Sequence, residues 1–70
     1  MDVKKQFGQN VRKLRERKGW SQEDLSEYSG LHRTYISGIE RGVRNPTIDI
    51  VQRVAVALGC RPSDLLKEER

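Results

Sequence analysis

The chain has 70 residues, and its fourteen Lys and Arg against ten Asp and Glu leave a formal net charge of +4. This length suits one small domain with a single core and is too short for a core accompanied by a separate ligand-binding domain, so residues 1–70 are expected to form one unit. The lone cysteine, Cys60, excludes an intramolecular disulfide, and no apolar run approaches the ~20 residues that span a bilayer.

The first 18 residues carry much of the positive charge. They contain Lys4, Lys5, Arg12, Lys13, Arg15, Arg17 and Lys18. A basic surface indicates an anionic partner such as nucleic acid, although charged helix faces are also common on other soluble proteins. The opening MDVKKQFG lacks the apolar core of a signal peptide, so a cytoplasmic location is expected.

The same segment predicts the first helix. Its apolar positions recur at helical spacing: Val3, Phe7, Val11 and Leu14. This stripe indicates an amphipathic helix over residues 3–18, which Gly19 ends.

Two short helices are expected next. Ser21 and Asp24 have the spacing of a capping box, and the hydrophobic-staple positions around it hold Trp20 and Leu25. A helix is therefore predicted over residues 22–28, followed by a third over residues 32–41 with Gly42 as its C-terminal cap. Two short helices joined around a glycine have the form of a helix-turn-helix.

Two further helices complete the prediction. Thr47 caps a segment whose helical spacing continues to Gly59, with apolar residues Ile48, Val51, Ala55 and Leu58. Pro62 then opens a short helix, PSDLL. Since no period-two segment of useful length occurs, the sequence predicts an all-α fold, a compact five-helix bundle.

The segment 32–41 divides into two faces on a helical wheel. One face carries Ile36, Ile39 and Glu40, and the other carries Thr34, Ser37, Gly38 and Arg41. A glycine inside a helix costs about 1 kcal/mol relative to alanine. We interpret Gly38 as bare backbone that lets this outer face approach a DNA groove. The alternatives are close packing against a neighbouring helix and sequence drift at a tolerant position. Arg33 can bond guanine bidentately and Thr34 can contact a base, although solvated surface residues would look the same.

An enzyme is not indicated. The chain offers one Cys and one His with no motif joining them, and it has no cluster of Cys and His that would bind a metal. No cofactor is expected, and Cys60 is expected to pack as a small apolar residue.

Four stretches in order along the chain carry a family resemblance: VRKLRERKGWSQEDLS, SGLHRTYISGIERG, RNPTID and VAVALG. They resemble the lambda-repressor and Cro type of helix-turn-helix regulator, also called the xenobiotic-response-element type, from about Val11 to Leu66. RTYISGIERG followed by RNPT looks most like the controller proteins of restriction-modification systems, which are compact dimers without an effector domain. The resemblance implies a lambda-repressor-like bundle that regulates transcription by binding double-stranded DNA at a two-fold operator.

The resemblance also assigns roles to residues. Base-reading positions are Arg33, Thr34, Ser37 and Gly38. Phosphate-binding positions are Gln22, Tyr35, Arg44 and Asn45, to which we add Arg41 at the end of the outer face. Arg15 and Glu40 match an ion pair between the first and third helices. His32 departs from the usual Ser, Thr or Asp cap, so the start of the third helix is expected to be shifted or less secure.

The expected partners are DNA and a second copy of the chain. The candidate dimer interface comprises Ile50, Leu65 and Leu66, with core closure as the alternative role for the leucines. A membrane and a small-molecule effector are not expected, and the protein's own concentration would be the signal. RNA polymerase is a further candidate through the acidic residues Glu23, Asp24 and Glu27. The alternative function is an antitoxin that binds a toxin protein and also its own promoter.

Overall fold

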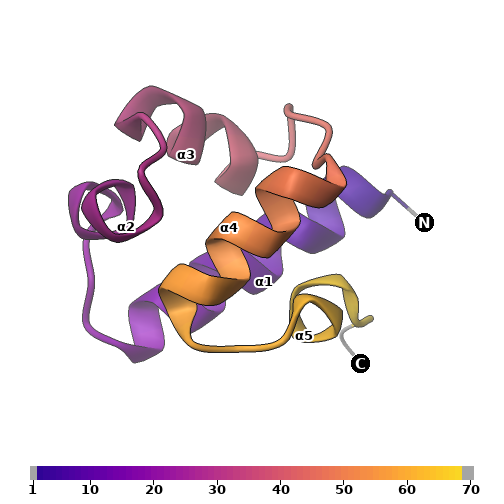
Figure 1. Ribbon diagram of the computed structural model, residues 1–70. Helices are drawn as coiled ribbons and strands as arrows, with labels where there is room; N and C mark the ends of the chain where they lie inside the picture. The colour runs from indigo at the N-terminus through magenta and orange to yellow at the C-terminus, as the bar shows by residue number, and fades with distance from the viewer. Residues whose placement is uncertain (1, 69–70) are drawn as a thin grey trace.

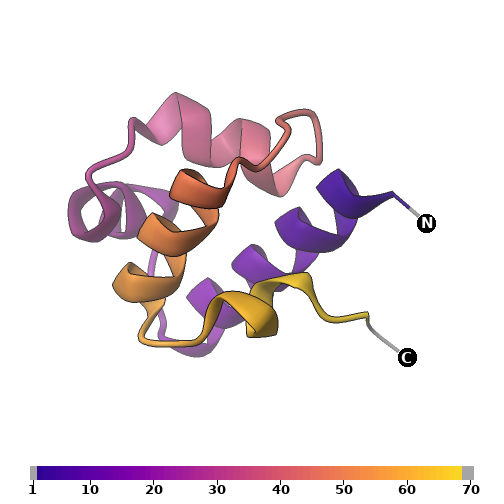
Figure 2. The same cartoon turned by 45° about the vertical axis from the view of Figure 1, so that its right-hand side comes forward.

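A computed structural model describes residues 2–68, and over this range the chain forms five α-helices. They are α1 (Val3–Arg17), α2 (Gln22–Ser29), α3 (Arg33–Glu40), α4 (Ile48–Leu58) and α5 (Pro62–Leu66). In both views α3 lies above and α5 below the pair formed by α1 and α4, and α2 lies to the left (Figures 1 and 2). The all-α bundle expected from the sequence is confirmed. None of these helices is long and apolar enough to cross a membrane.

The predicted capping signals fix the ends of the helices. Ser21 Oγ accepts a hydrogen bond from the Asp24 backbone N–H at 3.1 Å, and the Asp24 carboxylate accepts one from the Ser21 N–H at 2.8 Å. Thr47 Oγ1 accepts from the Ile50 N–H at 3.2 Å. These bonds satisfy N–H groups that have no partner inside their own helix, which is why the predicted starts of α2 and α4 are correct.

His32 caps the start of α3, although histidine is not among the usual capping residues. His32 has an extended backbone, and its Nδ1 accepts a hydrogen bond from the Thr34 N–H at 3.2 Å. An imidazole nitrogen without a proton is an acceptor, so it takes the place of a hydroxyl or carboxylate oxygen. Helix α3 begins at Arg33, directly after this cap and one residue later than the predicted range 32–41.

One core lies between the helices. Its fully or nearly fully buried apolar residues are Phe7, Val11, Leu25, Ile36, Ile39, Val51, Val54, Ala55, Leu58 and Leu65. Leu65 is 0% exposed, so its assignment to a dimer interface is wrong and the alternative of core closure is correct. Ile50 is half-buried against this core, whereas Leu66 is 46% exposed. Of the three candidates, Leu66 is the most exposed.

Helices α1 and α3 touch through their backbones. A Cβ atom added to Gly8 on α1 would lie 2.2 Å from the carbonyl oxygen of Ile39 on α3. Such a distance is far below any real contact of a side-chain carbon, so only glycine permits this approach. Gly8 therefore determines how closely α3 packs on α1, a role that the sequence alone did not indicate.

Polar side chains of α1 also hold the end of α5. The buried Asn10 Nδ2 donates to the carbonyl oxygens of Leu65, at 2.8 Å, and Lys67, at 2.9 Å. Gln6 Nε2 donates to the same Lys67 oxygen at 2.8 Å. The last carbonyls of a helix have no partner within it, and these amides supply one.

Candidate nucleic-acid interface

The turn between α2 and α3 is held by its own side chains. Ser26 Oγ donates to the carbonyl oxygen of Leu31, and Ser29 Oγ accepts from the Leu31 N–H at 3.2 Å. Gly30 adopts the left-handed conformation, with φ of 74°, which allows the chain to reverse there. The two helices of the expected helix-turn-helix are thereby fixed relative to each other.

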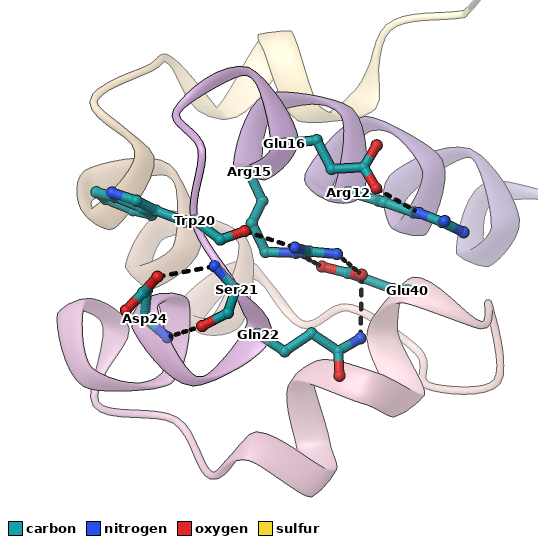
Figure 3. Close-up of polar contacts among 8 residues, drawn as sticks. All are labelled: Arg12, Arg15, Glu16, Trp20, Ser21, Gln22, Asp24 and Glu40. Atoms are coloured by element: carbon teal, nitrogen blue, oxygen red, sulfur yellow. Dashed lines mark hydrogen bonds and ion pairs between the residues drawn. The ribbon is translucent and has the colours of Figure 1, made fainter.

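A buried ion pair fixes the inner side of α3 (Figure 3). Arg15 Nε and Nη2 donate to the two carboxylate oxygens of Glu40, at 2.6 and 2.9 Å, and Arg15 Nη1 donates to the carbonyl oxygen of Trp20 at 2.7 Å. The side chains are only 11% and 5% exposed. The expected pair between the first and third helices is therefore present, in the bidentate geometry that favours arginine.

The pair favours the charged form of Arg15. The hydrogen bonds that Arg15 donates to Glu40 raise the pKa of Arg15 above its ordinary value, more than burial lowers it. A raised pKa in the folded state stabilises the fold below the ordinary pKa, and this contribution is lost only as the pH rises through the raised value. An arginine is protonated throughout the pH range of a cell even without a partner, so this contribution does not vary there.

Gln22 joins this network from the start of α2. Its Nε2 donates to Glu40 Oε1 at 3.2 Å (Figure 3). A carboxamide nitrogen carries two hydrogens, so this bond leaves one that a phosphate oxygen could accept. The assignment of Gln22 to phosphate binding stays a prediction, and the structure adds a second role in which Gln22 links α2 to α3.

The outer face of α3 is polar and largely open. Arg33 and Thr34 are exposed in its first turn, and Ser37 is half-buried one turn later. Arg41 is exposed just after the helix, and its Nε donates to the carbonyl oxygen of Ser37 at 3.3 Å. Side chains of this size and polarity, presented on one face of a helix, match what a major groove admits.

Gly38 does not lie open on that face, and this corrects the sequence analysis. The residue is buried, because the side chain of Arg44 lies across it. A Cβ on Gly38 would be 2.9 Å from Cγ and 3.2 Å from Nε of Arg44. The interpretation as a bare patch on the base-reading face is wrong, because a helical wheel shows neighbours within the helix and not a loop side chain folded over it.

Arg44, in the loop after α3, also lies beside the aromatic ring of Tyr35 on α3. Its guanidinium carbon is 5.3 Å from the centre of the Tyr35 ring, within the range of a cation–π interaction. Tyr35 is half-buried, while Arg44 and the neighbouring Asn45 are exposed. Two of the predicted phosphate-binding residues thus lie together on the flank of α3.

The loop that carries Arg44 rests on the first helix. A Cβ on Gly42 would be 2.9 Å from Cγ and 3.1 Å from Cα of Lys5, and Gly42 has φ of 78°. The Val43 N–H donates to the carbonyl oxygen of Gly38 at 3.1 Å. Close packing at Gly42 therefore brings the α3–α4 loop against the first turn of α1, in agreement with Figure 1.

Cys60, the single cysteine, lies outside α3 and the loop that follows it. Cys60 is half-buried and packs against the core, as expected, and its burial raises the pKa of the thiol. Among residues 2–68, no group of three or more His, Cys, Asp or Glu side chains could hold a metal ion. The exposed surface of α3 and the following loop offers cations and hydrogen-bond donors, which suit a polyanion.

Comparison with known proteins gives one family and several close relatives. A family model described as helix-turn-helix matches residues 11–65. The control protein C.BamHI of Bacillus amyloliquefaciens is 51% identical over 61 residues, which cover 86% of this chain and 75% of that protein. The crystal structure of the restriction-modification controller protein C.AhdI from Aeromonas hydrophila is 45% identical and has a TM-score of 0.85, covering 89% of this chain and 94% of that one.

A third similar structure contains DNA. It is the tetramer of the controller protein C.Esp1396I in complex with its natural 35 base-pair operator. The identity is 35% and the TM-score 0.82, over 96% of this chain and 99% of that one.

Proposed function

The chain belongs to the helix-turn-helix family of DNA-binding transcriptional regulators, and from this membership we propose that it is a restriction-modification controller protein that binds a two-fold operator as a homodimer. Its family and its controller relatives make it a regulator and not an enzyme. The observation that carries the proposal is the arrangement of α3, whose inner side is fixed by the Arg15–Glu40 pair while its outer face stays polar and open. The complex of C.Esp1396I with its operator supports it.

We propose that the whole described bundle acts as one DNA-binding domain with α3 in the major groove. In the first turn of α3, Arg33 and Thr34 face base edges, with Ser37 behind them. Phosphate contacts come from the surrounding positions: Gln22, Tyr35, Arg41, Arg44 and Asn45. Phosphate contacts set the register of the helix without reading sequence, and the few base contacts of one helix gain selectivity only when a second copy binds the other half-site.

The first test separates base reading from phosphate binding. The operator is obtained as the duplex that the wild-type protein enriches from a random pool. We expect Arg33→Ala to lose about 1 to 3 kcal/mol against this duplex and to bind an unrelated duplex almost as well as wild type, because a bidentate contact to guanine is sequence-specific. We expect Arg44→Ala to weaken both duplexes alike and to reduce the salt dependence.

Titrations by fluorescence anisotropy at several salt concentrations measure both effects. Thr34→Ala serves as a second base-reading variant and Asn45→Ala as a second phosphate variant. If Arg33→Ala and Arg44→Ala gave the same profile on the two duplexes, the division between the two kinds of contact would be wrong.

The proposed dimer surface is an apolar groove away from α3. It is lined chiefly by Val3, Pro46, Ile48, Val51, Pro62 and Leu66. Ile48 is 91% exposed and Val3 is 56% exposed, and both are large apolar side chains. We propose that a second copy of the chain covers this groove, a proposal supported by the tetramer that C.Esp1396I forms on its operator.

The second test concerns this groove. We expect Ile48→Glu to weaken self-association at least about tenfold, since it places a charge in an apolar contact worth roughly 1.4 kcal/mol or more. A carboxylate in the first turn of α4 is compatible with the helix dipole, so the fold should persist. Sedimentation equilibrium measures the dimer dissociation constant. Val56→Glu, at another exposed apolar site on α4, is the control. Unchanged association of Ile48→Glu would leave the groove for a different protein and favour the antitoxin alternative.

We propose that acidic residues on α2 contact RNA polymerase. Glu23 and Glu27 are exposed on α2, whereas the Asp24 carboxylate is engaged in the capping box. We therefore propose Glu23 and Glu27, and not Asp24, for a polymerase contact. Such a contact would make the bound protein an activator.

A further inference from the structure

Gly38 on α3 packs against the side chain of Arg44 from the loop between α3 and α4. The missing side chain of Gly38 leaves a shallow place on α3, and the aliphatic part of Arg44 fills it, with Cγ 2.9 Å and Cδ 3.6 Å from where a Cβ would be. Glycine destabilises a helix relative to alanine, but at this position it makes room for the side chain of Arg44. Gly38 is buried, whereas the other outer-face residues, Thr34, Ser37 and Arg41, are half-buried or exposed.

The same contact directs the charged end of Arg44. With its aliphatic part over Gly38, the guanidinium lies over the ring of Tyr35, 5.3 Å from the ring centre. Gly38 and Tyr35 are three residues apart and are neighbours on the helix surface. An arginine that is otherwise exposed on a loop is therefore held in one place on α3.

We propose that Gly38 is a positioning residue: it seats Arg44 on the recognition helix beside Tyr35, so that the loop cation and the helix meet DNA as one preformed surface. The inference rests on the proposed function of α3 and deepens it, since Gly38 contributes to DNA binding through Arg44 and not by its own contact. Preforming the surface removes the need to order a flexible arginine when DNA binds.

The experiment is a double-mutant cycle between residues 38 and 44. The probes are the enriched duplex and an unrelated duplex of the same length, and the variants are Gly38→Ala, Arg44→Ala and the combination. We expect Gly38→Ala to weaken binding about three- to tenfold on both duplexes and to lower the salt slope by about 1, the value of one phosphate contact. In the Arg44→Ala background the same change should have almost no effect.

A merely structural role for Gly38 would give a different result. Alanine favours a helix more than glycine does, and only the movable side chain of Arg44 opposes it, so Gly38→Ala should melt at or above the wild-type temperature. A loss of DNA binding with undiminished stability therefore points to positioning. Unchanged binding by Gly38→Ala overturns the proposal, and so does a loss that persists in full when Arg44 is already alanine.

A second measurement needs no DNA. Protons above an aromatic ring resonate upfield, so NMR should show the Arg44 δ and ε protons shifted upfield in the wild type. We expect the shift to disappear in Gly38→Ala and in Tyr35→Leu. Ordinary shifts in the wild type, or shifts that persist in Gly38→Ala, overturn the seating of Arg44. If the wild type enriches no duplex, the proposed function fails, and the proton shifts still decide whether Gly38 holds Arg44.

Discussion

Arg15→Ala should destabilise the protein by about 3 to 5 kcal/mol, the usual consequence of leaving one member of a buried ion pair without its partner. Glu40 would keep a carboxylate that is only 5% exposed and would lose two of the hydrogen bonds that it accepts. Trp20 would also lose the donor to its carbonyl oxygen. Since small domains are stable by only about 5 to 15 kcal/mol, much of the population should unfold at moderate temperature.

The same helix provides a matched control. Arg12 pairs with Glu16 at 3.1 Å, but these side chains are 64% and 54% exposed. An exposed pair of this kind contributes about 0.3 to 0.5 kcal/mol, so Arg12→Ala should be nearly neutral. Urea denaturation followed by circular dichroism compares the two variants. Equal midpoints for Arg15→Ala and Arg12→Ala would refute a stabilising role for the buried pair.

Gly8→Ala should destabilise the protein by roughly 3 kcal/mol, near the upper end of the usual range for overpacking. The new Cβ would lie 2.2 Å from the carbonyl oxygen of Ile39, and this oxygen belongs to the backbone of a packed helix. Either α1 and α3 must separate or their backbones must bend. The helix propensity of alanine works in the opposite direction by about 1 kcal/mol, so a net loss would identify the clash as the larger effect.

Gly38→Ala is the control for this substitution. Both glycines lie inside helices, but the atoms that a Cβ on Gly38 would meet belong to the movable side chain of Arg44. Thermal unfolding should therefore separate the two variants clearly, with Gly8→Ala melting far lower. If Gly8→Ala were as stable as Gly38→Ala, backbone contact between α1 and α3 would not determine how α3 is seated.

The ends of the helices could be predicted because they depend on local chemistry. Ser21 and Thr47 satisfy backbone N–H groups within three residues of themselves, and Gly30 adopts a conformation that most residues avoid. Such signals can be recognised wherever they occur in a sequence. The inner face of α3 was also predictable, since Ile36 and Ile39 recur at helical spacing.

The errors concern contacts between distant parts of the chain. Leu65 and Leu66 are adjacent and equally apolar, and only the packing of α5 decides that the first is buried and the second is not. Gly38 was placed on the correct face of its helix, yet the loop arginine that covers it could not be seen from the helix alone. Gly8 gave no signal at all, because the oxygen that requires it belongs to Ile39.

Helix α1 precedes α5 in the chain and packs against it. Asn10 binds the carbonyl oxygen of Leu65, 55 residues further along the chain. A polypeptide interrupted before Leu65 would present the side of α1 that α5 covers to water, and such incomplete chains are substrates for cellular proteases. Chains interrupted before Leu65 would then contribute little to the supply of active regulator.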